Sequence, residues 1–138
     1  MLKYYTSLLC SFLAAGLLVT SASLAVAQTQ LEKPTYLALT PSFVTNYGND
    51  GRLHYLKVDI SVRVESIPDS QTVDNHTPQI RNELILLLSQ QTSDGVNTHE
   101  GRQKLRADAL QAVQEILVAE EGRKMVTDLL FDNFIVQS

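Results

Sequence analysis

The chain has 138 residues, with a hydrophobic fraction of 44%, a charged fraction of 19% and a formal net charge of −4. These proportions are typical of a globular protein and exclude a disordered one, and the length suits a single domain with a modest core. Acidic and basic residues are interspersed, so the basic surface of a nucleic-acid binder is missing and no nucleic-acid partner is expected.

Residues 1–27 form an apolar segment that is expected to lie outside the globular domain. Lys3 is its only charged residue. Residues 25–27 (Ala-Val-Ala) match the pattern of a signal-peptide cleavage site, and several serines and threonines dilute the segment, which favours cleavage. About 20 apolar residues also suffice to cross a bilayer, so a retained signal anchor is the alternative. In either case the rest of the chain is predicted to be exported.

The only cysteine, Cys10, lies inside this apolar segment. The remainder of the chain can therefore form no intramolecular disulfide and offers no thiol as a nucleophile or metal ligand. Ten basic and fifteen acidic residues follow residue 27, which gives that part a net charge of −5. Residues 28–35 are polar apart from a few side chains and contain Pro34, so they are predicted to be a linker to a domain over residues 36–138.

A β-hairpin is predicted to open the domain. Residues 35–47 are rich in β-branched and aromatic side chains, and Pro41 indicates an edge position or a bulge. Residues 48–51 (Gly-Asn-Asp-Gly) suit a tight turn because these residue types tolerate positive φ. Residues 54–65 then alternate between apolar and polar side chains, which predicts a strand with one buried and one solvent-facing side.

The first of two predicted amphipathic helices covers residues 77–91. Thr77 is placed to cap it, and Pro78 suits the first helical position. The preceding residues 66–75 are interpreted as a connector in which the helix can already begin. The apolar stripe of this helix is predicted to comprise Ile80, Leu84, Leu87 and Leu88.

The second predicted helix runs from a cap at Thr98 to a stop at Gly122, after a break over residues 92–97. One face is apolar and is expected to be buried, and the opposite face is polar. The apolar face comprises Leu105, Ala109, Ala112, Val113, Ile116 and Leu117, and the polar face comprises Lys104, Asp108, Gln111 and Glu115.

Residues 126–137 are predicted to form a third strand with Leu130, Phe134 and Val136 on one face. The resulting order β-β-α-α-β implies an α+β domain. A small antiparallel sheet, made of the hairpin and the C-terminal strand, packs on the two helices.

The search for chemistry gives no catalytic residues, no metal site and no cofactor. Asp74 with His76, and His99 with Glu100, resemble fragments of ligand sets, but no third ligand has suitable spacing. No serine lies in a nucleophile elbow, and no glycine-rich phosphate loop is present. The chain is therefore not expected to be an enzyme.

Several motifs, in their order and spacing, resemble the FliL family of flagellar basal-body-associated proteins. The resemblance covers roughly residues 36–137 and includes the hairpin. Each motif is weak alone, and the ordered set is specific. The residues that carry it are His76, Pro78, Ile80, Arg81, Asn82, Ser89, Thr92, Glu100, Gly101, Leu105, Arg106, Phe131, Phe134, Val136 and Gln137.

The resemblance implies a single-pass inner-membrane protein whose periplasmic domain is similar in fold to stomatins and prohibitins. Family members are expected at the flagellar basal body beside the stator, in homo-oligomeric rings that support motor rotation, swimming, swarming and chemotaxis. The candidate assembly or fold-defining residues are Pro78, Arg81, Asn82, Gly101, Phe131 and Phe134.

Two questions stay open at this point. On helical spacing Arg81 borders the apolar stripe, so it serves either its own domain core or a neighbouring subunit. The N-terminal segment departs from the family because it lacks a basic cytoplasmic tail and ends in a cleavage pattern. The alternatives are therefore a soluble periplasmic form, cleaved after Ala27, and a stomatin-like scaffold or binding module with no flagellar role.

Overall fold

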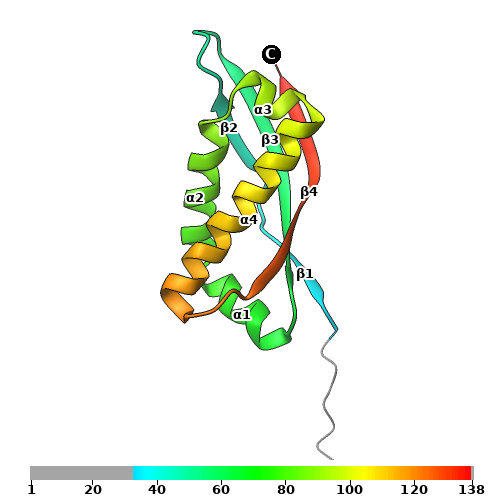
Figure 1. Cartoon of the computed structure of the whole chain (residues 1–138), viewed down its shortest axis with the longest axis vertical. Helices are drawn as coiled ribbons and strands as arrows, with labels where there is room; N and C mark the ends of the chain where they lie inside the picture. Colours follow the sequence, from blue (N-terminus) through cyan, green and yellow to red (C-terminus); the bar gives the residue numbers. More distant parts are fainter. Residues whose placement is uncertain (1–32, 138) are drawn as a thin grey trace, which may run out of the picture. The chain divides into compact units, whose positions relative to one another are not determined.

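A computed structural model describes residues 33–137, so the predictions for residues 1–27, including the signal peptide or anchor, lie outside the described residues. The described part is an α+β domain with a four-stranded antiparallel sheet, which confirms the predicted fold class (Figure 1). The helices of this part are each too short or too polar to span a bilayer. The elements are β1 (Thr35–Ala38), β2 (Phe43–Tyr47), β3 (His54–Val64), α1 (Ile67–Asn75), α2 (Thr77–Ser89), α3 (Ser93–Asn97), α4 (His99–Glu121) and β4 (Val126–Gln137).

Strand β3 is the centre of the sheet. One end of β3, at Val64, pairs with Thr35 of β1 and with Val126 of β4. The other end, at His54, pairs with Tyr47 of β2. Because β4 pairs along nearly the whole of β3 on one side, β1 and β2 share the other side, end to end.

The prediction of a single strand over residues 35–47 is therefore wrong in one respect. The structure has two strands there, β1 and β2, separated by residues 39–42. Residues 39–42 lie opposite only residues 59–60 of β3, so the edge bulges at this point. Pro41 has no N–H to donate to the ladder, which explains why pairing stops there and agrees with the predicted bulge. Leu39, at the start of the break, is buried in the core.

The β2–β3 hairpin is confirmed, and its turn follows the residue types that predicted it. Gly48 and Gly51 have φ values of 93° and 76°, in the left-handed region that favours glycine. The Gly48 N–H also donates to the carbonyl of Gln91, 3.0 Å away, which ties the turn to the end of α2.

Residues 33–137 contain four helices where two were predicted. The predicted connector contains α1, whose N-cap Ser66 accepts a hydrogen bond from the backbone of Asp69 at 3.1 Å. The predicted break after α2 contains the short helix α3. Helix α1 escaped prediction because Val73 is its only buried apolar residue, so it has no apolar stripe. Thr77 does not cap α2, because its hydroxyl instead donates to the carbonyl of Val73.

Helices α2 and α4 supply the helical half of the core. Both ends of α4 agree with the prediction: Thr98 accepts a hydrogen bond from the Gly101 N–H at 3.0 Å, and Gly122 ends the helix with a φ of 78°. The buried side chains of these two helices are Ile80, Leu84 and Leu88 of α2 and Leu105, Ala109, Val113 and Leu117 of α4.

In β4 the predicted face contains one error. Leu129 is buried in the core, whereas Leu130 pairs with Ser61 on the other side of the sheet. The register shifts between Asp59 and Ile60, so Asp132 has no partner in β3 and the alternation changes phase there. Phe134 lies on the core side as predicted, because it follows this irregularity.

Candidate functional site

Titratable side chains do not converge on a catalytic or metal centre in residues 33–137. No group of three or more His, Cys, Asp or Glu side chains there is placed to hold a metal ion. His76 instead joins Glu121 at the end of α4, with 2.6 Å between Nε2 and Oε1. The notable features of these residues are the side-chain contacts that join separate elements and two exposed surfaces.

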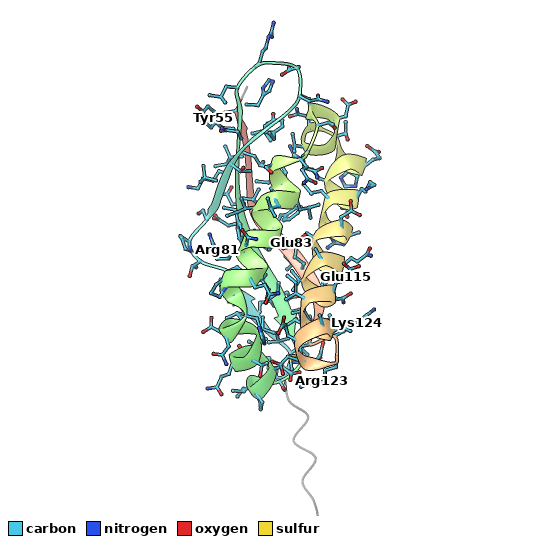
Figure 2. The ribbon with its side chains drawn as sticks, turned by 90° about the vertical axis from the view of Figure 1, so that its left-hand side faces the viewer. Tyr55, Arg81, Glu83, Glu115, Arg123 and Lys124 are labelled. Atoms are coloured by element: carbon cyan, nitrogen blue, oxygen red, sulfur yellow. The ribbon has the colours of Figure 1, made fainter. Side chains whose placement is uncertain are left out.

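Arg81 fills the interruption between β1 and β2. Its Nη1 atom donates to the carbonyls of Leu39 at 2.9 Å and Pro41 at 2.7 Å. Its guanidinium carbon also lies 4.1 Å from the centroid of the Phe43 ring, in cation–π geometry. All these contacts lie within the one domain, and Figure 2 shows Arg81 on α2 beside this edge of the sheet. They support a structural role and explain why a basic residue lies beside the apolar stripe of α2.

Replacing Arg81 with methionine should lower the free energy of unfolding by about 1–2 kcal/mol. Hydrogen bonds to charged groups contribute about 1.5–3 kcal/mol, and the half-exposed position of Arg81 reduces that value. Urea unfolding would measure the change. In the control, Arg106→Met, the lost ion pair to Asp128 spans 3.9 Å on the surface and should change stability by less than about 1 kcal/mol. Equal losses in the two variants would contradict the structural role.

The other predicted site residues lie on three elements: Pro78 and Asn82 on α2, Gly101 on α4, and Phe131 and Phe134 on β4. Pro78 and Asn82 lie exposed on the first turns of α2, and Pro78 is its second residue, one place after the predicted first position. Gly101 lies in the first turn of α4 against the backbone of α3, where an added Cβ would collide with backbone atoms of Asp94 and Gly95. Glycine is thus the residue that lets the two helices meet.

Phe131 and Phe134 lie together on β4, with ring centroids 5.3 Å apart. Arg102 of α4 places its guanidinium carbon 4.7 Å from the Phe134 centroid and donates through Nε to the Val96 carbonyl at 2.6 Å. Arg102 therefore joins α3, α4 and β4, much as Arg81 joins α2 to the opposite edge. No local pattern distinguishes Arg102, since a basic residue early in a helix also suits a solvated face.

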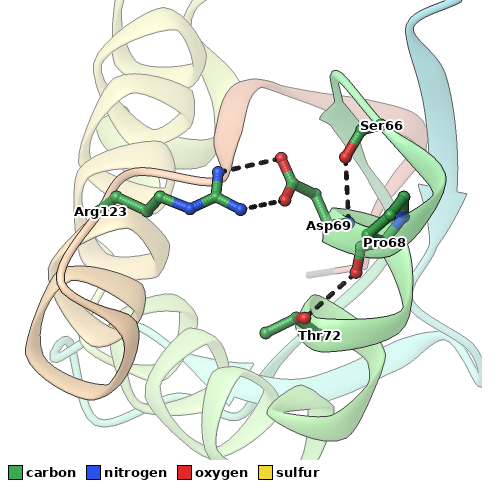
Figure 3. A network of polar contacts seen from close by, with 5 residues as sticks. All are labelled: Ser66, Pro68, Asp69, Thr72 and Arg123. Carbon is green, nitrogen blue, oxygen red and sulfur yellow. Dashed lines mark hydrogen bonds and ion pairs between the residues drawn. The ribbon is translucent and has the colours of Figure 1, made fainter. Parts of the chain in front are cut away.

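An ion pair between Asp69 and Arg123 was also missed. The two side chains form a bidentate pair across 54 positions of sequence, with Nη1 3.2 Å from Oδ2 (Figure 3). The Asp69 side chain is 9% exposed, and that of Arg123 is 59% exposed. The pair holds α1, which has little apolar contact of its own, to the turn between α4 and β4. Hydrogen bonds from Arg123 lower the pKa of Asp69 below its ordinary value.

Because the pKa of Asp69 is lower in the folded state, ionised Asp69 stabilises the fold fully above the unfolded carboxyl pKa of about 3.9. That stabilisation is lost as the pH falls through the folded-state pKa. Asp69→Asn should therefore be less stable than the wild type at neutral pH, and the difference should vanish in acid. Urea unfolding across this pH range would measure it. Asp108→Asn, which removes an exposed pair with Lys104, is the control, and a pH-independent deficit in Asp69→Asn would contradict the assignment.

Two exposed surfaces lie on opposite sides of the domain. The first, the α4 groove, has a volume of about 630 Å³. Figure 2 shows two of its residues, Glu115 and Lys124, on the side of α4 that faces away from α2. The groove is lined by Ala107, Leu110, Gln111, Gln114, Glu115, Val118, Ala119 and Lys124.

The second surface, the sheet patch, lies on the face of the sheet opposite the helices. Val44 and Ile135 flank Lys57 in the register of the strands, and Tyr55 precedes it on the same face. Val44, Tyr55 and Ile135 are 62%, 44% and 41% exposed, so this face carries an apolar patch around one positive charge. In the part of the chain that the structure describes, no strand pairs with the outer edge of β4. Unpaired edges and exposed apolar patches are typical of interaction surfaces.

Comparison with known proteins gives one consistent result. The family model described as "Flagellar basal body-associated protein FliL" matches residues 36–137. The "Flagellar protein FliL" of Escherichia coli (strain K12) is 29% identical over 110 residues, which are 80% of this chain and 70% of that protein. The protein of the same name from Aquifex aeolicus (strain VF5) is 30% identical over 99 residues, 72% of this chain and 59% of that protein.

Proposed function

Since the chain belongs to the FliL family of flagellar basal-body-associated proteins, we propose that it is a non-enzymatic accessory of the flagellar motor that assembles beside the stator. The match over residues 36–137 carries this proposal, because it spans nearly all of the described domain. In this role the protein supports motor rotation, swimming, swarming and chemotaxis. The domain lies in the periplasm, held to the inner membrane by the N-terminal segment, and its fold is similar to that of stomatins and prohibitins.

The assembly that we propose is a homo-oligomeric ring. Rings form when two different patches of one subunit meet head to tail and the rotation closes. The α4 groove and the sheet patch lie on opposite sides of the domain, as such a contact requires. The groove contains both Glu115 and Lys124, and Lys57 lies in the patch, so opposite charges favour a contact that pairs Glu115 with Lys57 and leaves Lys124 outside it.

Deletion of the gene should impair swimming and swarming while filaments remain, because an accessory of the stator is not part of the rod or filament. Motility assays under high viscous load, with microscopy of the filaments, would measure this. Normal motility of the deletion strain would exclude the stator role, and missing filaments would indicate a role in flagellar assembly instead.

Charge substitutions in the same strain test the ring contact. Glu115→Lys and Lys57→Glu should each weaken motility and self-association, and the double variant should recover part of both. Surface substitutions usually cost little stability, so the loss should occur in folded protein. Glu83→Lys, an equal charge change on exposed α2, is the matched control. Failure of the double variant to recover would count against this contact and leave the deletion result unaffected.

A further inference from the structure

We propose that the end of the domain that carries the N-terminus of α1 rests on the phospholipid surface, with Ile67 in contact with the bilayer. This inference depends on the membrane attachment included in the proposed function. Ile67 is 75% exposed, which is more than any other exposed large apolar side chain in residues 33–137. It follows the cap residue Ser66 directly, so a structured turn presents it and not a loose loop.

The register of the sheet brings basic side chains to this same end. Val64 pairs with Thr35 and with Val126, so Lys33 and Lys124 lie two residues before those partners, while Ile67 lies three residues beyond Val64. Figure 1 shows the starts of β1, α1 and β4 at one end of the sheet. Both lysines are exposed, and no ion pair engages either of them within the described residues.

The acidic groups at this end are mostly compensated. Asp69 is paired with Arg123 and Glu65 with Arg63, whose Nε lies 3.5 Å from the carboxylate, and Glu121 accepts a hydrogen bond from His76. Glu120 and Asp74 are exposed and add two opposing charges, so the attraction to lipid depends on the local pairing of Lys33 and Lys124 with Ile67. An exposed isoleucine beside two lysines is the combination that favours an anionic lipid interface, where the apolar side chain enters and the ammonium groups meet the headgroups.

The short connection between the apolar segment and the domain indicates that the bilayer is the surface in contact with Ile67. Residues 28–32 separate the predicted apolar segment from Lys33, and a chain from Ala27 to Lys33 spans roughly 22 Å at most. A segment retained in the membrane therefore keeps this end near the lipid headgroups. Such a tether raises the effective concentration of the surface, so a contact too weak to hold a free domain becomes well populated.

The experiment uses the full chain with Cys10→Ser and Gln71→Cys, labelled at residue 71 with an environment-sensitive fluorophore. Gln71 is exposed on α1, one turn beyond Ile67, so the label reports on this end without replacing Ile67. The protein is reconstituted into vesicles of phosphatidylethanolamine and phosphatidylglycerol, with a quencher carried at the headgroup boundary. We expect the lipid quencher to reduce the fluorescence and Ile67→Ser to abolish most of that reduction.

Leu53→Ser is the matched control. Leu53 is 61% exposed in the turn at the opposite end of the sheet, and its replacement should leave the quenching unchanged. Quenching that is absent, or that is the same with Ile67→Ser, while the protein stays with the vesicles in alkaline carbonate would overturn the contact. Release of the protein by carbonate would overturn it together with the anchor. Neither result would change the motility of the deletion strain, which tests the basal-body role separately.

Discussion

Replacing Leu88 with aspartate should unfold the domain. Leu88 is 1% exposed and belongs to the core formed by α2, α4 and the sheet. Loss of a buried leucine side chain alone costs about 2–5 kcal/mol, and an unpaired buried carboxylate adds several kcal/mol. Domains of this kind are stable by about 5–15 kcal/mol, so the combined loss removes most or all of the stability.

Circular dichroism and urea unfolding of residues 28–138 would measure this effect, because that fragment contains all the described core residues. Leu86→Asp is the control. Leu86 lies on the same helix two residues earlier and is 47% exposed, so a carboxylate there stays in water. A folded Leu88→Asp variant with cooperative unfolding near that of the wild type would contradict the described core.

Replacing Gly101 with alanine should also destabilise the domain, although alanine is the better helix former. A Cβ would lie 2.7 Å from the carbonyl oxygen and 2.8 Å from the Cα atom of Gly95, with Asp94 still closer. All three atoms belong to the backbone, so relief requires α3 to move away from α4. We expect a loss at or above the upper end of the about 1–3 kcal/mol typical of overpacking. That loss exceeds the gain of about 1 kcal/mol from helix propensity.

The matched control for this substitution is Gly95→Ala, measured by the same urea unfolding. The Cβ of residue 95 would approach the amide oxygen of Gln91 to 2.9 Å, and a flexible side chain can turn away where a backbone cannot. Gly95→Ala should therefore cost clearly less than Gly101→Ala. If Gly101→Ala equalled the wild type in stability, the close contact of α3 and α4 would be wrong.

Sequence patterns predicted the elements whose signal is local. The strict alternation of β3, the apolar stripes of α2 and α4, and the glycines at positive φ all depend on near neighbours in the chain. Helix α1 was missed because it has no apolar stripe of the kind that holds α2 to the core. An ion pair from Asp69 to Arg123, which is distant in sequence, holds α1 instead. The predicted face of Leu130 was wrong because it also depends on a distant strand. Only the register against β3 shows that Asp132 interrupts the alternation.

The candidate residues differ in the same way, because some have a local sequence pattern and others only long-range contacts. Arg81 became a candidate because it borders the apolar stripe of α2 and belongs to the family motif, and the structure gives it carbonyl partners in the interrupted edge strand. Arg102 makes equivalent contacts, but it lies among the mixed charges of α4 and had no feature to distinguish it. A long-range contact of an ordinary surface residue leaves no trace in one sequence.

The interruption between β1 and β2 also determines how the domain responds to a pull on its N-terminal side. Strand β1 consists of residues 35–38, none of which is fully buried, and Leu39 is the first core residue after it. Tension at Lys33 would therefore peel β1 from β3 at the cost of the partly buried Leu37 alone, and the Arg81 contacts with Leu39 and Pro41 would stop the peeling there. The detached strand adds about 13 Å of extended chain. Under load, detachment of β1 would therefore extend the N-terminal chain by a short distance before the buried core unfolds.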